Sequence, residues 1–177
     1  IAVNGNNVHI TWEQYYSSQS YYAAEYARST NGGETFGSPG TVSSSGNTVS
    51  ETAISAQGSN VVIGWLEDSD SGDVLKSKTS SNTGSTFGTE TIVATSDAGS
   101  YAFLSSDNDG GANYYFSWLE IPVSGQREVF SARSANSGST WNSPVNVDGI
   151  DNGDENQFRA SSVVEANSDR VFVLWSE

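Results

Sequence analysis

The chain has 177 residues, enough for one ordinary domain or for part of a larger one. Its formal net charge is −14, and because phosphate binding needs a basic patch we expect neither a nucleic-acid partner nor an anionic membrane surface. It has no cysteine and therefore no disulfide, and no apolar stretch is long enough to span a bilayer as a helix.

Polar and apolar residues alternate with a period of two through most of the chain, which predicts half-buried strands and no helix. The expected strands are 8–14, 21–29, 36–42, 51–57, 60–67, 73–79, 87–94, 100–105, 113–121, 127–134, 141–147, 157–164 and 170–177. They fall into groups of four. We expect the first group to lack its first strand and the last group to hold only its first two.

A tryptophan closes the second expected strand of every group, and a glutamate follows one or two residues later. The tryptophans recur 53, 53 and 57 residues apart, at Trp12, Trp65, Trp118 and Trp175. Self-similarity at this period is typical of propellers and solenoids, in which each repeat is one supersecondary unit. We expect the tryptophans to be equivalent, buried and packed between repeats. The glutamates that follow them are interpreted as having the same structural task in each repeat.

A second pattern, Ser-x-Asn-x-Gly-x-Thr-aromatic, lies between the third and fourth strands of three groups. Glycine supplies a positive φ, asparagine and the hydroxyls can bond the turn's own backbone, and the aromatic ring can plug the turn onto the sheet. The pattern therefore predicts a structural turn. Its residues are Ser29, Asn31, Gly33, Thr35 and Phe36; Ser80, Asn82, Gly84, Thr86 and Phe87; and Ser134, Asn136, Gly138, Thr140 and Trp141.

These turns resemble the Asp-box, or bacterial neuraminidase repeat, with asparagine in place of the consensus aspartate. Asp-boxes lie between the third and fourth strands of β-propeller blades in sialidases and in many non-sialidase propellers of microbial surfaces and secreted enzymes. The resemblance implies an all-β fold of antiparallel four-stranded propeller blades. The implied blade pieces are about 1–46, 47–96, 97–148 and 149–177. It also implies an extracellular or cell-surface location.

A propeller closes on itself with roughly 4–8 blades, and the expected strands fill only a little more than three. The chain also opens within a repeat and contains no methionine. We therefore expect it to be a piece of a longer, processed chain. The remaining blades would come from the same native chain or from another subunit.

The resemblance makes glycoside hydrolysis the first enzymatic hypothesis, because sialidases clamp their substrate carboxylate with three arginines. Arg159 is the one arginine on an expected first strand, whereas Arg28 and Arg133 precede their turns at the outer edge of a blade. His9, the single histidine, lies in an alternating strand and is better explained as a structural residue than as a base. We therefore expect no catalytic residue in these 177 residues.

Two functions remain open at this point. The first is a non-catalytic module that acts as a scaffold or recognises glycans or proteins. The alternative is part of a sialidase-like glycoside hydrolase whose catalytic residues lie mostly elsewhere. The discriminating feature is the number of arginines on first strands of the complete protein.

Weaker patterns suggest ligand and metal contacts. Aromatic faces beside loops can stack on sugars, and the candidate ligand contacts are Arg159, Tyr16, Tyr22 and Tyr115. Turns with aspartate at alternate positions suit Ca²⁺, although none has an EF-hand pattern and a solvated turn is the simpler interpretation. The candidate calcium ligands are Asp68, Asp70, Asp73, Asp107 and Asp109.

Overall fold

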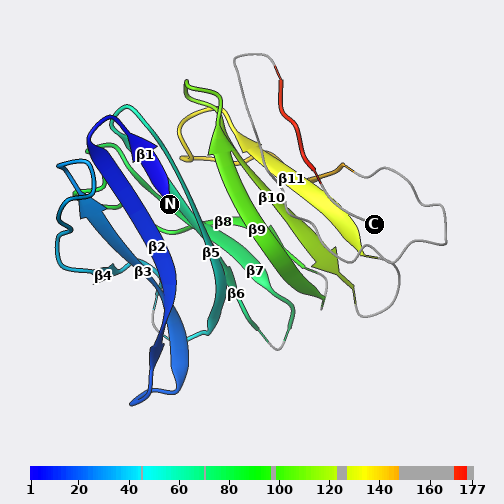
Figure 1. Ribbon diagram of the computed structural model, residues 1–177. Helices are drawn as coiled ribbons and strands as arrows, with labels where there is room; N and C mark the ends of the chain where they lie inside the picture. The colour runs from blue at the N-terminus through cyan, green and yellow to red at the C-terminus, as the bar shows by residue number, and fades with distance from the viewer. Residues whose placement is uncertain (45, 70, 97–98, 123–126, 148–169, 175–177) are drawn as a thin grey trace.

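The computed structural model describes residues 1–44, 46–69, 71–96, 99–122, 127–147 and 170–174 (Figure 1). Every element in these ranges is a β-strand, so none of the described residues forms a helix that could cross a membrane. The strands are β1 (Ala2–Asn4), β2 (Asn7–Tyr16), β3 (Tyr21–Ser29), β4 (Gly40–Thr41), β5 (Val49–Gln57), β6 (Asn60–Glu67), β7 (Val74–Ser80), β8 (Thr91–Thr95), β9 (Ser100–Asn108), β10 (Tyr114–Ile121), β11 (Glu128–Ser134) and β12 (Val145–Asn146).

These strands form three antiparallel four-stranded sheets, β1–β4, β5–β8 and β9–β12, each in chain order. The three sheets lie side by side, in the order in which they occur in the chain (Figure 1). This confirms the expected all-β fold of four-stranded propeller blades, and each sheet is called a blade below. The first strands of neighbouring blades lie against each other, since Asn108 Nδ2 of β9 donates to Ser55 Oγ of β5 over 2.8 Å.

The first blade is complete, so the expectation that it lacks its first strand is wrong. Strand β1 pairs with β2 in the register Ala2↔His9, and the two are joined by a tight turn in which Gly5 has φ 59°. The strand was missed because three residues are too few to show an alternating pattern.

The fourth strands are shorter than the sequence pattern predicts. Strands β4 and β12 have 2 residues each, whereas β8 has 5. Proline cannot donate to a sheet ladder, and Pro39 and Pro144 directly precede β4 and β12. The corresponding segment of the second blade has no proline, so its ladder runs longer. The expected strand 157–164 lies outside the described residues.

Apolar side chains fill the space between successive blades. Tyr26 of the first blade packs in one cluster with Ile63 and Trp65 of the second. Leu66 and Leu75, on the other face of the second blade, pack in another cluster that includes Phe116 and Trp118 of the third. The core of this molecule is therefore divided between the blade interfaces, as it is in a repeat protein.

Three of the four marker tryptophans can be compared, since Trp175 lies outside the described residues. Trp12, Trp65 and Trp118 all lie on second strands, which confirms the alignment of the repeats. Trp65 and Trp118 are 0% exposed, and each packs in the interface with the preceding blade. Trp12 is only half-buried. No blade precedes the first one among the described residues, which explains the difference.

The close approach of the blades depends on a glycine in the middle of a strand. A Cβ atom on Gly64 of β6 would lie 2.4 Å from Cζ of Phe116 in the next blade. Glycine in a strand interior often marks such a contact, because any side chain would separate the two sheets.

The two ends of each blade have different structures. At one end the turn between first and second strands bonds the motif turn of the same blade: Gly32 N donates to Asn6 O, Thr83 N to Ser59 O and Ser137 N to Ala112 O, over 2.8, 2.7 and 2.8 Å. The other end, called the connection end below, carries the turns between second and third strands and the segments that join blades. The repeat motif is therefore remote from the connection end.

Candidate functional site

The motif turns satisfy their own polar groups. In the second turn Ser80 Oγ accepts from Gly84 N over 2.9 Å and donates to Asn82 Oδ1 over 2.8 Å. Asn82 Oδ1 accepts from Thr86 N over 3.0 Å, and its amide Nδ2 donates to Thr86 Oγ1 over 2.8 Å. The same bonds recur in the other two turns. Because these hydrogen bonds lie within the turn itself, we assign the motif a structural role. The asparagine side chain supplies both an acceptor and a donor.

Each motif turn also docks on the preceding blade where one is present. A Cβ on Gly84 would lie 1.9 Å from the Tyr26 hydroxyl of the first blade, and Phe87 packs edge-on against the Tyr26 ring at 4.9 Å. Arg28 Nη1 of the first blade donates to the Thr83 carbonyl over 2.6 Å. The turn therefore acts as a joint between blades as well as a link between strands.

The joint between the first two blades contains the single histidine. His9 is 1% exposed, and its Nδ1 shares a 2.7 Å hydrogen bond with the Tyr26 hydroxyl. Burial, and then the positive charge of Arg28, lower the pKa of His9 below its usual 6.5. Burial also raises the pKa of Tyr26 to about 12. Both rings are therefore neutral at pH 7.

Because the pKa of His9 is lower in the folded chain than in the unfolded chain, the unfolded chain binds the extra proton first. The contribution of His9 to stability is complete above pH 6.5 and is lost as the pH falls through 6.5 toward the lower folded value. We expect the free energy of unfolding, measured with urea, to differ less between about pH 7.5 and about pH 5.5 in His9→Gln than in the natural protein. An equal difference would mean that His9 does not titrate in this joint.

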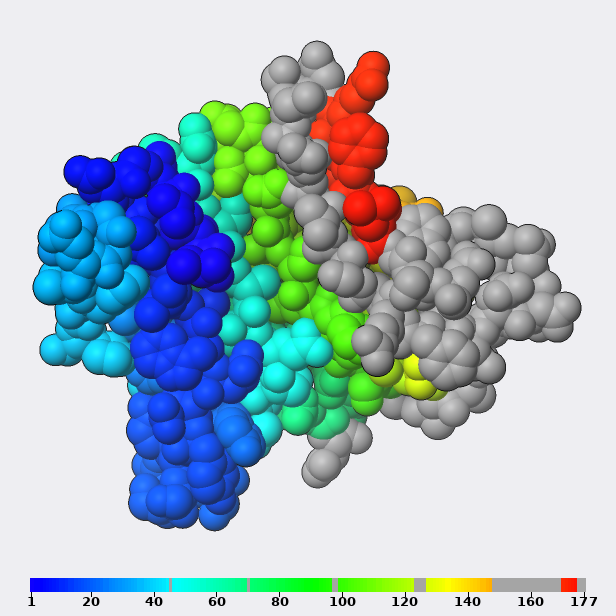
Figure 2. All heavy atoms as spheres, viewed as in Figure 1, coloured from blue at the N-terminus to red at the C-terminus, as the bar shows by residue number. Residues whose placement is uncertain are grey.

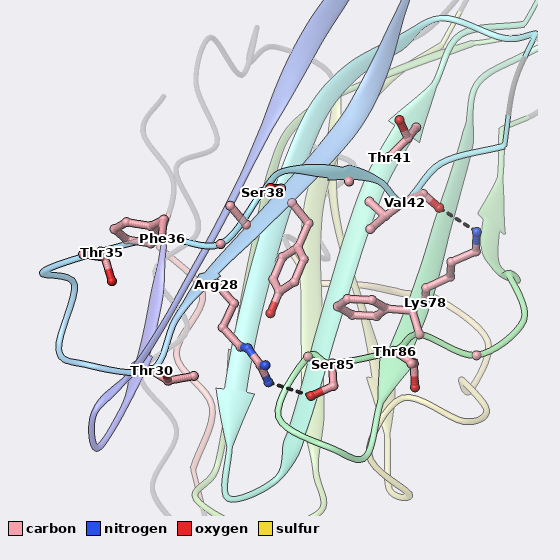
Figure 3. Close-up of a pocket in the computed structure, with 17 residues that line it drawn as sticks. Arg28, Thr30, Thr35, Phe36, Ser38, Thr41, Val42, Lys78, Ser85 and Thr86 are labelled. Atoms are coloured by element: carbon pink, nitrogen blue, oxygen red, sulfur yellow. Dashed lines mark hydrogen bonds between the residues drawn. The ribbon is translucent and has the colours of Figure 1, made fainter.

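A groove of about 710 Å³ lies along the outer side of the same joint (Figure 3). It contains two of the chain's seven basic residues, Arg28 and Lys78. Both side chains are hydrogen bonded within the protein, because Arg28 Nη1 donates to Ser85 Oγ over 2.8 Å and Lys78 Nζ donates to the Val42 carbonyl over 2.6 Å. We interpret this groove as part of the blade joint.

A second groove, of about 860 Å³, lies at the connection end between the second and third blades. We call it the serine groove. Three separate segments build it, and its lining residues are Gly46, Asn47, Thr48, Ser50, Asp68, Ser69, Ser71, Asp73, Ser100 and Tyr101. None of them is basic. Seven are exposed, namely Gly46, Asn47, Ser50, Asp68, Ser69, Ser71 and Ser100. Short hydroxyl and amide groups beside a carboxylate suit a ligand rich in hydroxyls.

Buried Asp73 fixes the shape of the serine groove. Its Oδ2 accepts from Tyr101 N over 2.8 Å and its own N–H donates to the Gly99 carbonyl over 3.1 Å. Burial raises the pKa of Asp73, and the Tyr101 amide offsets part of that rise. Asp73 therefore joins the β6–β7 turn to the start of β9. Asp68 is an exposed carboxylate of the groove, and its N–H donates to the Thr48 carbonyl over 2.8 Å.

Behind the groove, the negative charge of Glu67, two residues after Trp65, is balanced by a lysine. Glu67 is 2% exposed, accepts a hydrogen bond from Asn47 Nδ2 and pairs with Lys76 Nζ at 2.8 Å. Lys76 Nζ also pairs with Glu90 at 2.9 Å. Burial alone would lower the pKa of Lys76, but its bonds to the two carboxylates raise it overall. In this blade the glutamate of the repeated Trp–Glu marker therefore forms a structural ion pair with Lys76.

The candidate sugar-stacking tyrosines lie at two different ends of the molecule. Tyr16 and Tyr22 lie on the β2–β3 hairpin, which projects from the body in Figure 2. Cross-strand partners complete two tyrosine pairs there, Tyr15 with Tyr22 at 5.0 Å and Tyr16 with Tyr21 at 5.7 Å. Tyr115 lies toward the motif end of β10, opposite Arg133, so the structure does not bring it to the others.

The candidate calcium ligands that the structure describes do not gather into one site. Among the described residues, no three His, Cys, Asp or Glu side chains lie close enough to hold a metal ion. The Asp109 carboxylate accepts bonds from the Gly111 and Asn113 amides of its own turn. Asp107 lies on β9. Asp70 and Arg159, the remaining acidic and basic candidates, lie outside the described residues.

The fold is that of part of a β-propeller, and comparison with solved structures agrees. The Hadza microbial sialidase Hz136 matches with a TM-score of 0.65 and 13% identity over 79% of this chain and 35% of that one. The GH93 α-L-arabinofuranosidase of Fusarium graminearum, in complex with arabinobiose, matches with a TM-score of 0.52 and 11% identity, covering 73% of this chain and 42% of that one.

At these identities the likeness establishes the fold alone. The chain spans about 35–42% of the length of these two relatives. No protein-family model and no curated protein sequence matches the chain.

Proposed function

We propose that these blades belong to an extracellular or cell-surface propeller, with Asp-box turns as its blade joints, that recognises a neutral glycan in the serine groove. The observation that carries this proposal is the lining of that groove: exposed serines, an asparagine and Asp68, with no basic side chain among the described lining residues. A sugar offers many hydroxyls, each both donor and acceptor, to such a surface.

Charge supports a neutral ligand over an anionic one. The net charge of −14 repels an acidic sugar, and the part of the groove that the structure describes has no arginine to clamp a carboxylate. The named relatives, a sialidase and an arabinofuranosidase, both act on carbohydrates, which supports a glycan as the ligand class.

The proposal is tested with the natural full chain on an array of neutral and sialylated glycans, followed by titration calorimetry of the neutral glycan that binds best. We expect neutral glycans to bind, and Asp68→Ala or Ser100→Trp to weaken binding about tenfold or more. Ser38→Trp, an exposed change in the groove at the first joint, is the matched control and should leave binding unchanged. Retention of sialylated glycans alone would overturn the proposal.

Part of a glycoside hydrolase is the second candidate, favoured by the enzyme names of the structural relatives. The buried carboxylates beside the groove argue against catalysis by this segment, because Glu67 and Asp73 are each held by fixed donors. We expect these 177 residues alone to cleave neither a fluorogenic sialoside nor a fluorogenic arabinofuranoside. Turnover that is lost in Arg159→Ala would contradict this expectation.

We further propose that the remaining blades come from the same native chain or from another subunit. Val3 of β1 is 62% exposed and Trp12 of β2 is half-buried, so the first blade offers apolar surface for a neighbour. Unpaired strand edges and exposed apolar faces are uncommon on isolated soluble domains.

A further inference from the structure

The first strand of the third blade contains a β-bulge. Strand β9 pairs with β10 as Ser105↔Ser117 and Ala102↔Leu119, so Phe103 and Leu104 of β9 together face Trp118. Bulges bend a strand and redirect side chains, and they are frequent beside functional sites.

The bulge holds Phe103 in an unfavourable backbone conformation. Its φ is 56°, in the left-handed region that disfavours residues with a Cβ, and most of all bulky ones. The other described non-glycine residues with positive φ are the small Ser20, Thr83 and Ser137, and all three lie in turns. Phe103 is therefore unusual in both its size and its place within a strand.

A carboxylate from the neighbouring blade holds the bulge in place. Glu51 of β5 accepts the Phe103 amide on Oε1 over 2.8 Å and the Leu104 amide on Oε2 over 2.7 Å. A carboxylate that accepts two backbone N–H groups makes strong, charge-assisted bonds. Glu51 thus fixes the backbone on both sides of the Phe103 side chain.

The bulge leaves Phe103 40% exposed, so this residue is not part of the buried core. It lies on the strand that supplies Ser100 and Tyr101 to the serine groove, and Glu51 follows Ser50 of the same groove. At about 3.3 Å per residue, Phe103 lies roughly 7–10 Å along the strand from these positions. Strain held in an exposed aromatic residue beside a polar groove points to a ligand-contact role.

We infer that Phe103 is the aromatic platform on which a sugar ring stacks while the hydroxyls of the same glycan bind in the serine groove. The inference rests on the proposed glycan function and adds a specificity-determining residue to it. An aromatic face complements the apolar C–H face of a neutral sugar, and the serines complement its hydroxyl edges. Glu51 acts through Phe103 and is a positioning residue.

The test measures stability and binding together in the natural full chain, with arabinobiose, cellobiose and lactose as probes. Phe103→Gly removes the ring and relieves the left-handed strain, so it should keep or raise the melting temperature while weakening binding about tenfold. Phe103→Trp keeps an aromatic face and should bind within about threefold of the natural protein. Glu51→Gln should weaken binding and also lower the melting temperature, because its amide nitrogen cannot accept the second N–H.

Two results would overturn the inference. One is unchanged binding by Phe103→Gly while Asp68→Ala weakens binding, and this result would leave the glycan function standing. The other is a clear fall in the melting temperature of Phe103→Gly, which would show that the ring is needed for packing. If the natural protein binds no neutral glycan, the proposed function and the inference both fail.

Discussion

Gly84→Ala should lower the free energy of unfolding by about 2–5 kcal/mol, because two costs add at that position. Gly84 has φ 75°, where a Cβ costs about 1–2 kcal/mol. The new methyl group would also lie 1.9 Å from the Tyr26 hydroxyl, which is held by His9. Relieving that overlap, by moving the ring or separating the blades, costs about 1–3 kcal/mol more.

Gly33→Ala is the matched control, because Gly33 occupies the same place in the first motif turn. It also has a positive φ, of 92°, but its nearest neighbour would be Val8 Cγ2 at an ordinary 3.7 Å. This variant should lose only the backbone cost of about 1–2 kcal/mol. Urea unfolding of the two variants measures the difference. Equal losses would mean that the motif turn does not dock on the preceding blade.

Trp118→Ala should lower the free energy of unfolding by about 3–5 kcal/mol, the usual loss when a fully buried tryptophan is replaced by alanine. Trp118 is 0% exposed, and its ring lies 5.7 Å from that of Tyr101 and 6.1 Å from that of Phe130. The cavity would open in the interface between the second and third blades, where the cluster contains residues of both.

Trp12→Ala tests whether this loss comes from contact between blades. Trp12 occupies the equivalent place on β2 but is half-buried, so the same change should cost less than half as much in these 177 residues. The midpoints of chemical unfolding decide the comparison. A loss at Trp12 as large as that at Trp118 would show that the tryptophans stabilise their own blades, independently of any neighbour.

The sequence pattern predicted the blades because it is repeated. Period-two alternation located the long second and third strands, and the spacing of Trp12, Trp65 and Trp118 aligned them correctly. The short strands were missed or overextended, because β1 has too few residues to show a period and because Pro39 and Pro144 restrict the ladders that follow them. Local pattern therefore predicts a strand well only where the ladder is long.

The candidate site could not be predicted in the same way. The serine groove joins residues from 46–50, 68–73 and 100–101, and common serines in three separate segments carry no signal in the sequence. Phe103 appears in the sequence as an ordinary apolar residue of an alternating strand. Its left-handed backbone arises from a bulge opposite Trp118 and from Glu51 in another blade, both of which are tertiary features.

Hydrogen exchange of the natural full chain, with and without the neutral glycan that binds best, tests the central claim most directly. We expect the glycan to slow exchange in 46–50, 68–73 and 100–104, at the connection end, and to leave the three motif turns unchanged. Protection confined to the motif turns, or to the groove at the joint of the first two blades, would contradict the assignment of the serine groove as the glycan site.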